Sequence, residues 1–278
     1  MNLRIIRPLF CVLTIAFLAV IACPQTPGGP EPGAPKNEKP AKPSPTPDPK
    51  APPKPATADQ VIETSLFIYG LGGGRAKLDQ IRKTSVERGR SVVPAGRGTE
   101  TISYERTVIR GENTDKDKVR FDQDRPNARY ALVSVDGRTF GVYNNTIFTP
   151  SDDAVANFLN SIYHGVEAML RYKENGSKVD LAGREKEMGV EYYLIDVTDT
   201  KERKTRFYVS VKTFRVMKLT YSLGGVEYTR KFYNQNYTQG TLVAYRSVLT
   251  AGDRVVEETD ISSVTFGQKV DEDLFRAE

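Results

Sequence analysis

Few side chains in this sequence could catalyse a reaction. The 278 residues include one histidine, His164, and Ser161 lies three positions before it. A Ser–His–Asp arrangement also needs an acid that orients the histidine, and no acid stands at a suitable position near this pair. One histidine also falls short of the ligands that most transition-metal sites use. We therefore predict that the protein is not an enzyme and that it uses no metal and no cofactor.

Two other motifs resemble reactive sites but fit structural roles better. Acids are paired at residues 152–153, 257–258 and 271–273. The first pair precedes a helical pattern, where negative charge complements the helix dipole, and the others fit turns and strand faces. The glycines at 70–74 lack the preceding strand of a dinucleotide-binding loop, and Arg75 takes the place of its last glycine. We predict that these glycines form a helix stop and a sharp corner.

The first residues have the pattern of a secretory leader. Residues 1–22 carry two arginines near the start, followed by an apolar run over 9–21. Residues 20–23 read Val-Ile-Ala-Cys, which resembles the bacterial lipobox, in which the cysteine is acylated and becomes the new N-terminus. We therefore predict that Cys23 carries a lipid anchor. The alternative is a plain cleaved leader in which this cysteine is incidental.

Residues 23–57 have the composition of a solvated linker. Thirteen of the seventeen prolines lie between positions 24 and 55, among lysines and small residues. Such a tract cannot bury a core, so we predict that it is disordered and extended. At the polyproline rise its reach is on the order of 100 Å, which would hold a domain well away from a membrane.

Residues 58–278 have the size of one domain that is held together by its core alone. The other cysteine, Cys11, lies in the leader, so this domain cannot form a disulfide. The formal net charge of the chain is +5, and the leader and linker contribute +2 each, which leaves about +1 for the domain. A charge this small is no nucleic-acid footprint, and we expect no nucleic-acid partner.

Period-two alternation predicts a large antiparallel sheet in this domain. Three strands within residues 192–221, joined by polar turns, predict a meander in the middle of the sheet, with one apolar and one polar face. Four further strands are expected after the meander begins. Asp136-Gly137 is a strong hairpin signal. The strands expected before the meander cover residues 85–93, 99–109, 118–121, 129–135 and 139–143.

Helical patterns precede and interrupt these strands. Thr57 and Gln60 form a capping-box pattern before a first helix, and a short second helix carries Leu78 and Ile81. A broad apolar face predicts a third, amphipathic helix over 155–170.

A curved sheet and this third helix could enclose an apolar cavity, or they could pack as an ordinary core. The residues alone leave this alternative open. The candidate cavity residues are Phe158, Leu159, Ile162, Tyr163, Met169, Phe207, Val209, Met217, Leu219 and Tyr221.

The order of several short motifs resembles the periplasmic lipoprotein-carrier superfamily, the LolA/LolB-like proteins. The motifs are Gly72-Gly73 after a helix, Leu78-x-x-Ile81, Val135-Asp136-Gly137-x-x-Phe140-x-x-Tyr143, residues 193–221, Val264-Thr-Phe266 and Asp271-x-x-Leu274-Phe275. The resemblance covers nearly all of residues 58–278. It implies an eleven-strand-type half-barrel whose cavity binds acyl chains under covering helices. The domain has no tryptophan, and residue 140 is Phe where many relatives have Trp.

This resemblance and the lipobox together imply a role in the bacterial envelope. We expect an anchored, monomeric lipoprotein of the outer membrane that faces the periplasm and binds lipid or the acyl chains of lipoproteins. Such a protein would serve lipid or lipoprotein trafficking or outer-membrane maintenance. The alternative is a sensory or structural module that binds a protein partner. A cavity lined by the third helix and the meander favours the first role, and a packed interior favours the second.

Overall fold

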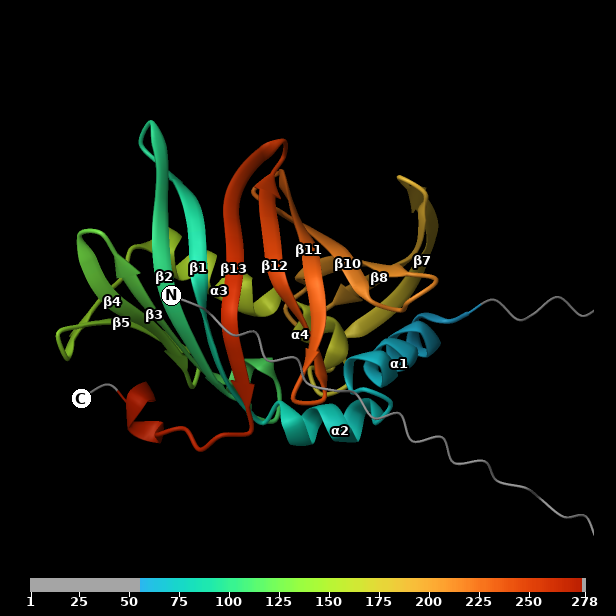
Figure 1. The fold of residues 1–278 in the computed structure, drawn as a ribbon, viewed down its shortest axis with the longest axis horizontal. Helices are drawn as coiled ribbons and strands as arrows, with labels where there is room; N and C mark the ends of the chain where they lie inside the picture. The colour runs from blue at the N-terminus through green and yellow to red at the C-terminus, as the bar shows by residue number, and fades with distance from the viewer. Residues whose placement is uncertain (1–55, 277–278) are drawn as a thin grey trace, which may run out of the picture. The chain divides into compact units, whose positions relative to one another are not determined.

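The computed structural model describes residues 56–276, which lie within a compact unit formed by Pro53–Glu278 (Figure 1). A single antiparallel sheet of thirteen strands and four α-helices form most of the described part. The predicted α+β class, with a curved antiparallel sheet covered by helices, is therefore confirmed. The predicted leader, Cys23 and the linker up to residue 55 lie outside the described residues.

The sheet consists of two runs of strands that meet near its centre. The first run is β1 (Thr84–Ala95), β2 (Gly98–Ile109), β3 (Lys118–Arg125), β4 (Ala128–Val135), β5 (Arg138–Tyr143) and β6 (Thr146–Phe148). The second run is β7 (Lys178–Glu187), β8 (Val190–Thr198), β9 (Lys204–Ser210), β10 (Val216–Leu223), β11 (Val226–Thr238), β12 (Thr241–Ala251) and β13 (Arg254–Phe266). Because β1 pairs with β13, the strand order is β6-β5-β4-β3-β2-β1-β13-β12-β11-β10-β9-β8-β7.

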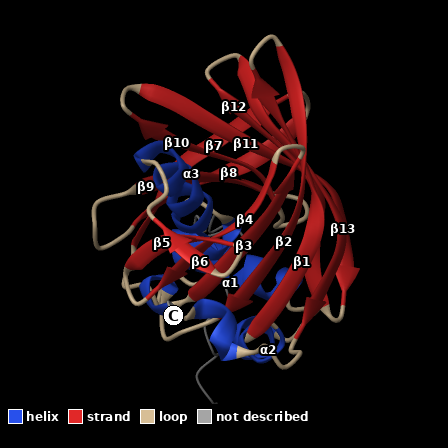
Figure 2. Cartoon of the chain, turned by 90° about the vertical axis from the view of Figure 1, so that its left-hand side faces the viewer, coloured by secondary structure: helices blue, strands red, loops and turns tan. Residues whose placement is uncertain are grey.

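The helices lie on the concave side and at one end of this sheet. They are α1 (Ala58–Tyr69), α2 (Gly74–Ile81), α3 (Asp152–Tyr163) and α4 (Val166–Leu170). Figure 2 shows the sheet bending around α3, with α2 at one end of β1 and β2. Two short 3-10 helices, Thr114–Lys116 and Glu272–Phe275, complete the described part.

Local sequence signals explain how the first helices begin and end. The Thr57 hydroxyl accepts a hydrogen bond from the Gln60 backbone N–H, and the Gln60 side chain accepts one from the Thr57 N–H. This is the predicted capping box. The helix ends at Gly70, and Gly72 and Gly74 have positive φ angles of 86° and 61°. The glycine run is therefore the predicted corner, because residues with a Cβ adopt such angles reluctantly.

The prediction of one continuous third helix is wrong. Residues 155–170 form two helices, α3 and α4, because the chain breaks at His164 and Gly165. Gly165 has an extended backbone, with φ −80° and ψ 172°. The His164 ring turns away to stack on Tyr221, with ring centroids 4.0 Å apart. This contact fixes the change of direction, which helical periodicity alone does not reveal.

The position predicted for the meander is also wrong. Strands β8, β9 and β10 form it, but they lie near one end of the sheet and only β7 is beyond them. The sheet has thirteen strands rather than the eleven that the resemblance implies. The prediction of four further strands after the meander begins does not give the observed count, since β9 to β13 follow β8 and three of them, β11, β12 and β13, lie after the meander.

Two clusters of buried apolar side chains fill different parts of the concavity. The first cluster packs α1 and α4 against the meander, and its centre includes Phe207, Val209 and Leu219, each with 0% exposed area. The second cluster packs α3 against β3 and β4. It consists of Val119, Leu132, Phe158 and Ile162. Both clusters consist of residues of the compact unit.

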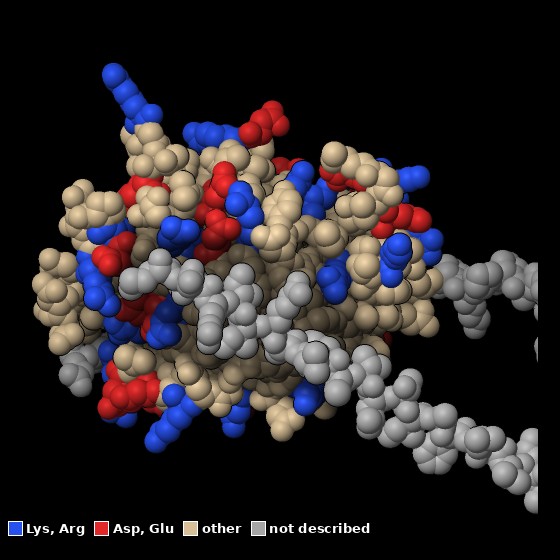
Figure 3. Space-filling view, in the orientation of Figure 1, with Lys and Arg blue, Asp and Glu red and all other residues tan. Residues whose placement is uncertain are grey.

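The outer surface carries charges of both signs. On the face that Figure 3 shows, Lys and Arg side chains are intermixed with Asp and Glu side chains over the uncovered surface. Among the described helices, none is long and apolar enough to cross a membrane.

Candidate functional site

A cavity of about 660 Å³ lies on the concave side of the sheet. Its walls come from β1, β2 and β3, from β11, β12 and β13, and from α3 and α4. This volume falls within the range of roughly 300–1,000 Å³ that is common for small-molecule sites. The cavity is therefore large enough to hold a ligand rather than only a few water molecules.

Much of the cavity wall is apolar. Alternation along the strands turns every second side chain of β2 and β3 inward, and α3 adds side chains from the opposite side. The ring of Phe121 contacts two other aromatic rings of the wall. Its centroid lies 5.3 Å from that of Tyr104 and 6.3 Å from that of Phe158. Other apolar residues on the wall are Val93, Ile102, Val108, Val119, Leu132, Ile162, Leu249, Val264 and Phe266.

Charged side chains divide this apolar wall. The lining includes six arginines, namely Arg82, Arg106, Arg110, Arg125, Arg171 and Arg230. It includes four acids, namely Glu87, Asp117, Glu167 and Glu257. Five of the six arginines have a carboxylate within 4.0 Å. Within residues 56–276, Arg106 has no hydrogen-bond or ion-pair partner, and its Nε atom is buried.

Tyr104 and Glu87 form a hydrogen-bonded pair beside Arg106. The Tyr104 hydroxyl donates to Glu87 Oε1 at 2.9 Å. Burial, and then the adjacent Glu87 charge, raise the pKa of the Tyr104 phenol, so it remains a donor. Gly89 makes room for this ring at a register shift between β1 and β13, because a Cβ there would lie 2.8 Å from the Tyr104 hydroxyl oxygen.

Arg230 and Glu257 form a second pair on the strands β11 and β13. Arg230 Nη2 donates to Glu257 Oε2 at 2.7 Å, and Arg230 Nη1 donates to Ser247 Oγ at 3.1 Å. Burial alone would raise the pKa of the Glu257 carboxyl. The Arg230 guanidinium outweighs this effect and holds that pKa below its usual value. The pair is therefore charged and internally satisfied.

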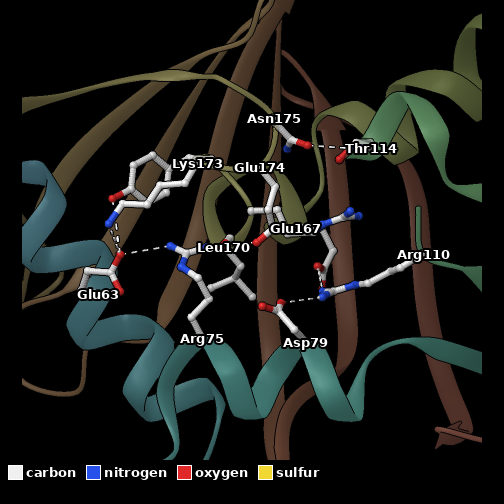
Figure 4. Close-up of polar contacts among 12 residues, drawn as sticks. Glu63, Arg75, Asp79, Arg110, Thr114, Glu167, Leu170, Lys173, Glu174 and Asn175 are labelled. Atoms are coloured by element: carbon white, nitrogen blue, oxygen red, sulfur yellow. Dashed lines mark hydrogen bonds and ion pairs between the residues drawn. The ribbon is translucent and has the colours of Figure 1, made fainter. Parts of the chain in front are cut away.

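An ionic network fixes α4 at one end of the cavity. Glu167 on α4 accepts hydrogen bonds from both Arg82 and Arg110. Burial would raise the pKa of Glu167, but Arg110 and Arg82 lower it to about 2. Figure 4 shows the network continuing to α2 through Asp79, which lies 3.4 Å from Arg110 Nη1. These contacts close this end of the cavity with neutralised charges.

A second set of ion pairs in Figure 4 joins α2 to α1. Arg75 on α2 contacts Glu63 on α1 at 3.0 Å and Glu174, which follows α4, at 3.2 Å. Lys173 also contacts Glu63, at 2.8 Å. The three helices are thus connected by ion pairs.

His164 lies at the break between α3 and α4. Its Nδ1 atom is 2.7 Å from Thr205 Oγ1, and its buried Nε2 atom has no partner in the described part of the chain. Burial, with a smaller effect of Arg203, lowers the pKa of His164 to about 4. Ser161 donates its hydroxyl to the Phe158 carbonyl at 2.7 Å instead. These two side chains are therefore arranged as structural groups and not as a base and a nucleophile.

The structure brings only some of the predicted cavity residues to the cavity wall. Phe158, Ile162 and Tyr221 line it. Four others are packed in the first cluster, namely Met169, Phe207, Val209 and Leu219. Leu159 and Tyr163 pack against the second cluster, and Met217 is half-buried near Gln235. The difference arises because α1 and α4 cover the meander, so the open space lies over β1–β3 and β11–β13.

The polar residues of the cavity were not among the residues predicted from the sequence. In the predicted strand 99–109, Ile102, Tyr104 and Val108 share one face, and Arg106 lies on that same face. A lone arginine on an otherwise apolar strand face was the available signal. Among the described residues, no group of three or more His, Cys, Asp or Glu side chains could hold a metal ion.

The fold is similar to that of several solved structures. No protein-family model and no curated protein match the sequence. A DUF1329 family protein from Desulfovibrio piger matches with TM-score 0.57 and 13% identity, covering 77% of this chain and 97% of its own. A putative outer membrane lipoprotein-sorting protein domain from Vibrio parahaemolyticus matches with TM-score 0.53 and 15% identity, covering 77% and 97%. A LolA superfamily protein from Nitrosomonas europaea matches with TM-score 0.54 and 14% identity, covering 80% and 99%. The chain therefore has a LolA/LolB-like fold, as the sequence motifs predicted.

Proposed function

We propose that this chain, with its LolA/LolB-like fold, binds lipid or the acyl chains of lipoproteins in a bacterial envelope. The observation that carries the proposal is the cavity of about 660 Å³ on the concave side of the half-barrel. Its aromatic and aliphatic wall suits a hydrocarbon chain, because burial of each methylene contributes roughly 0.8 kcal/mol. The role is binding and transfer or storage of lipid rather than catalysis.

The leader and linker motifs support a membrane-anchored form of this function. A lipid on Cys23 would hold the protein on a membrane, and residues 23–57 would let the cavity reach away from that membrane. We infer an outer-membrane lipoprotein that faces the periplasm and acts in lipid or lipoprotein trafficking or in outer-membrane maintenance.

A packed region supports the alternative role. The apolar face of the meander is covered by α1 and α4, and its central side chains are fully buried. A protein whose concavity is filled in this way could be a sensory or structural module that binds a protein partner. The cavity over β1–β3 and β11–β13 is the reason that we prefer lipid binding.

Native mass spectrometry of the protein from bacterial membranes tests the proposal. We expect the compact unit to carry a co-purified lipid that is released by gentle activation. An unliganded mass in every preparation, together with no uptake of added lipid, would favour the alternative role.

A further inference from the structure

We propose that the cavity binds an amphiphile with an acyl chain and an anionic head, and that Arg106 holds the head. The anion could be the carboxylate of a fatty acid or the phosphate of a phospholipid, since both offer charged oxygens to a guanidinium. This inference rests on the proposed lipid-binding function and specifies its ligand.

Arg106 is the lining arginine that lacks a carboxylate partner among the described residues. Its Nε atom is buried, and neither a hydrogen bond nor an ion pair within residues 56–276 uses its guanidinium. A buried donor without a partner costs about 1–3 kcal/mol, and more when it is charged. An anionic oxygen at this point of the cavity would remove that cost.

The neighbours of Arg106 are already engaged. Glu87 lies directly opposite Arg106 in the β1–β2 register, but its carboxylate accepts the Tyr104 hydroxyl at 2.9 Å and lies beyond 4.0 Å from the guanidinium. On the other side, Arg106 is opposite Phe121 of β3, which is apolar. The other five lining arginines pair with carboxylates, so Arg106 is the lining guanidinium left for an anionic group among the described residues. The wall therefore favours a negative group in the ligand.

The cavity of about 660 Å³ gives room for a hydrocarbon chain beside Arg106. Apolar side chains of the cavity wall, among them Val108, Phe121 and Phe158, would contact the chain.

Three probes with the same hydrocarbon chain separate the head from the tail. Displacement of a fluorescent fatty acid from the full chain would be measured with palmitate, hexadecyl phosphate and hexadecanol. We expect either anion to bind about 10- to 100-fold more tightly than the alcohol. The stronger of the two anions identifies the source of the head. Equal binding of all three would overturn the inference but keep the proposed function, and no binding of any would overturn both.

Removal of the guanidinium tests the residue itself. Arg106→Gln should weaken binding of the preferred anion about 10- to 100-fold and leave hexadecanol binding unchanged. Arg88→Gln is the matched control, since Arg88 lies on neighbouring β1 but is 60% exposed and pairs with Glu105. The melting temperature of Arg106→Gln should not fall, because no hydrogen bond or ion pair among the described residues uses the guanidinium.

A wild-type measurement covers the case in which Arg106→Gln does not fold. The carboxyl of bound palmitate labelled with carbon-13 should titrate in NMR with its pKa below that of palmitate in a neutral lipid vesicle, because a nearby guanidinium favours the charged form. Arg106→Lys should retain most of this lowering. A bound carboxyl whose pKa is raised would contradict the inference.

Discussion

Phe158 and Phe207 have the same side chain but different surroundings. Phe207 is fully buried in the first cluster, whereas Phe158 borders both the second cluster and the cavity. A side chain on a cavity wall lacks neighbours on one side, so its truncation removes fewer contacts. The two phenylalanines therefore separate packing from ligand binding.

We predict that Phe207→Ala lowers the free energy of unfolding by about 3–5 kcal/mol and leaves ligand affinity little changed. Phe158→Ala should cost less stability and weaken binding of a fluorescent acyl probe several-fold. Urea unfolding and probe titration on both variants measure these effects. If Phe158→Ala lost stability like Phe207→Ala while the wild type bound no probe, the packed-module alternative would be correct.

His164 is a buried neutral group whose charge the fold disfavours. Its pKa is about 4 in the folded protein, against an ordinary value of 6.5. Because the folded pKa is lowered, the unfolded chain takes up the proton first as the pH falls. Stability is therefore fully present above pH 6.5 and is lost between about pH 6.5 and pH 4.

We predict that this histidine makes the protein less stable by about 3 kcal/mol at pH 4 than at pH 7.5, since each pKa unit corresponds to roughly 1.4 kcal/mol. Urea unfolding at the two pH values measures the loss. His164→Asn removes the only histidine, so it should reduce the pH dependence by that amount. A variant with an unchanged pH profile would show that the loss arises from carboxyl groups instead.

At the scale of elements, Arg171, the residue after α4, holds this helix in place through an ion pair with Asp117. Arg171 caps the helix, and its Nη1 atom donates to Asp117 Oδ2 at 2.6 Å. The two side chains are 2% and 8% exposed. Asp117 also accepts the Gly111 N–H at 2.8 Å, which connects α4 to the loop between β2 and β3.

Asp117→Asn should therefore lower the free energy of unfolding by about 3–5 kcal/mol, because it leaves the Arg171 charge buried without its partner. The double variant Asp117→Asn, Arg171→Met should recover part of that loss. Both values come from urea unfolding. A loss below about 1 kcal/mol would mean that Glu174, 2.8 Å from Arg171 Nε, satisfies the charge alone.

The sequence predicted those features of the fold that depend on residues close together in the chain. The Thr57 capping box and the Asp136-Gly137 hairpin depend on neighbours in sequence, and both are present, the latter with φ angles of 50° and 74°. The break at His164 depends on Tyr221, which is distant in sequence and on another strand. No periodicity within residues 155–170 contains that information.

At the scale of the whole molecule, the fold class could be predicted but the open half of the sheet could not. The meander has the apolar alternation that suits a cavity wall and a core wall equally. Which of these it becomes depends on α1, whose Val61, Ile62 and Leu66 are fully buried in the first cluster. The position of the cavity follows from this long-range packing, so only three of the ten predicted cavity residues line it.

The predicted anchor acts on the molecule as a whole. Cys23→Ser should release the protein from membranes, because it removes the residue that would carry the acyl chains needed for stable anchoring. The described residues contain no helix that could span the membrane instead. Fractionation of cells into membrane and soluble material, followed by immunoblotting, measures the effect, with Cys11→Ser as the matched control. Retention of the Cys23→Ser variant in the membrane fraction would refute the lipid anchor.

The most direct test of lipid binding is to find where a lipid sits. A photoreactive palmitate analogue would be irradiated with the compact unit, and the labelled peptides would be mapped by mass spectrometry. We predict labelling within β2, β3 and α3, including peptides that contain Phe121 and Phe158, with competition by unlabelled palmitate. The absence of competable labelling, or labelling confined to the outer face of the sheet, would contradict the proposed function.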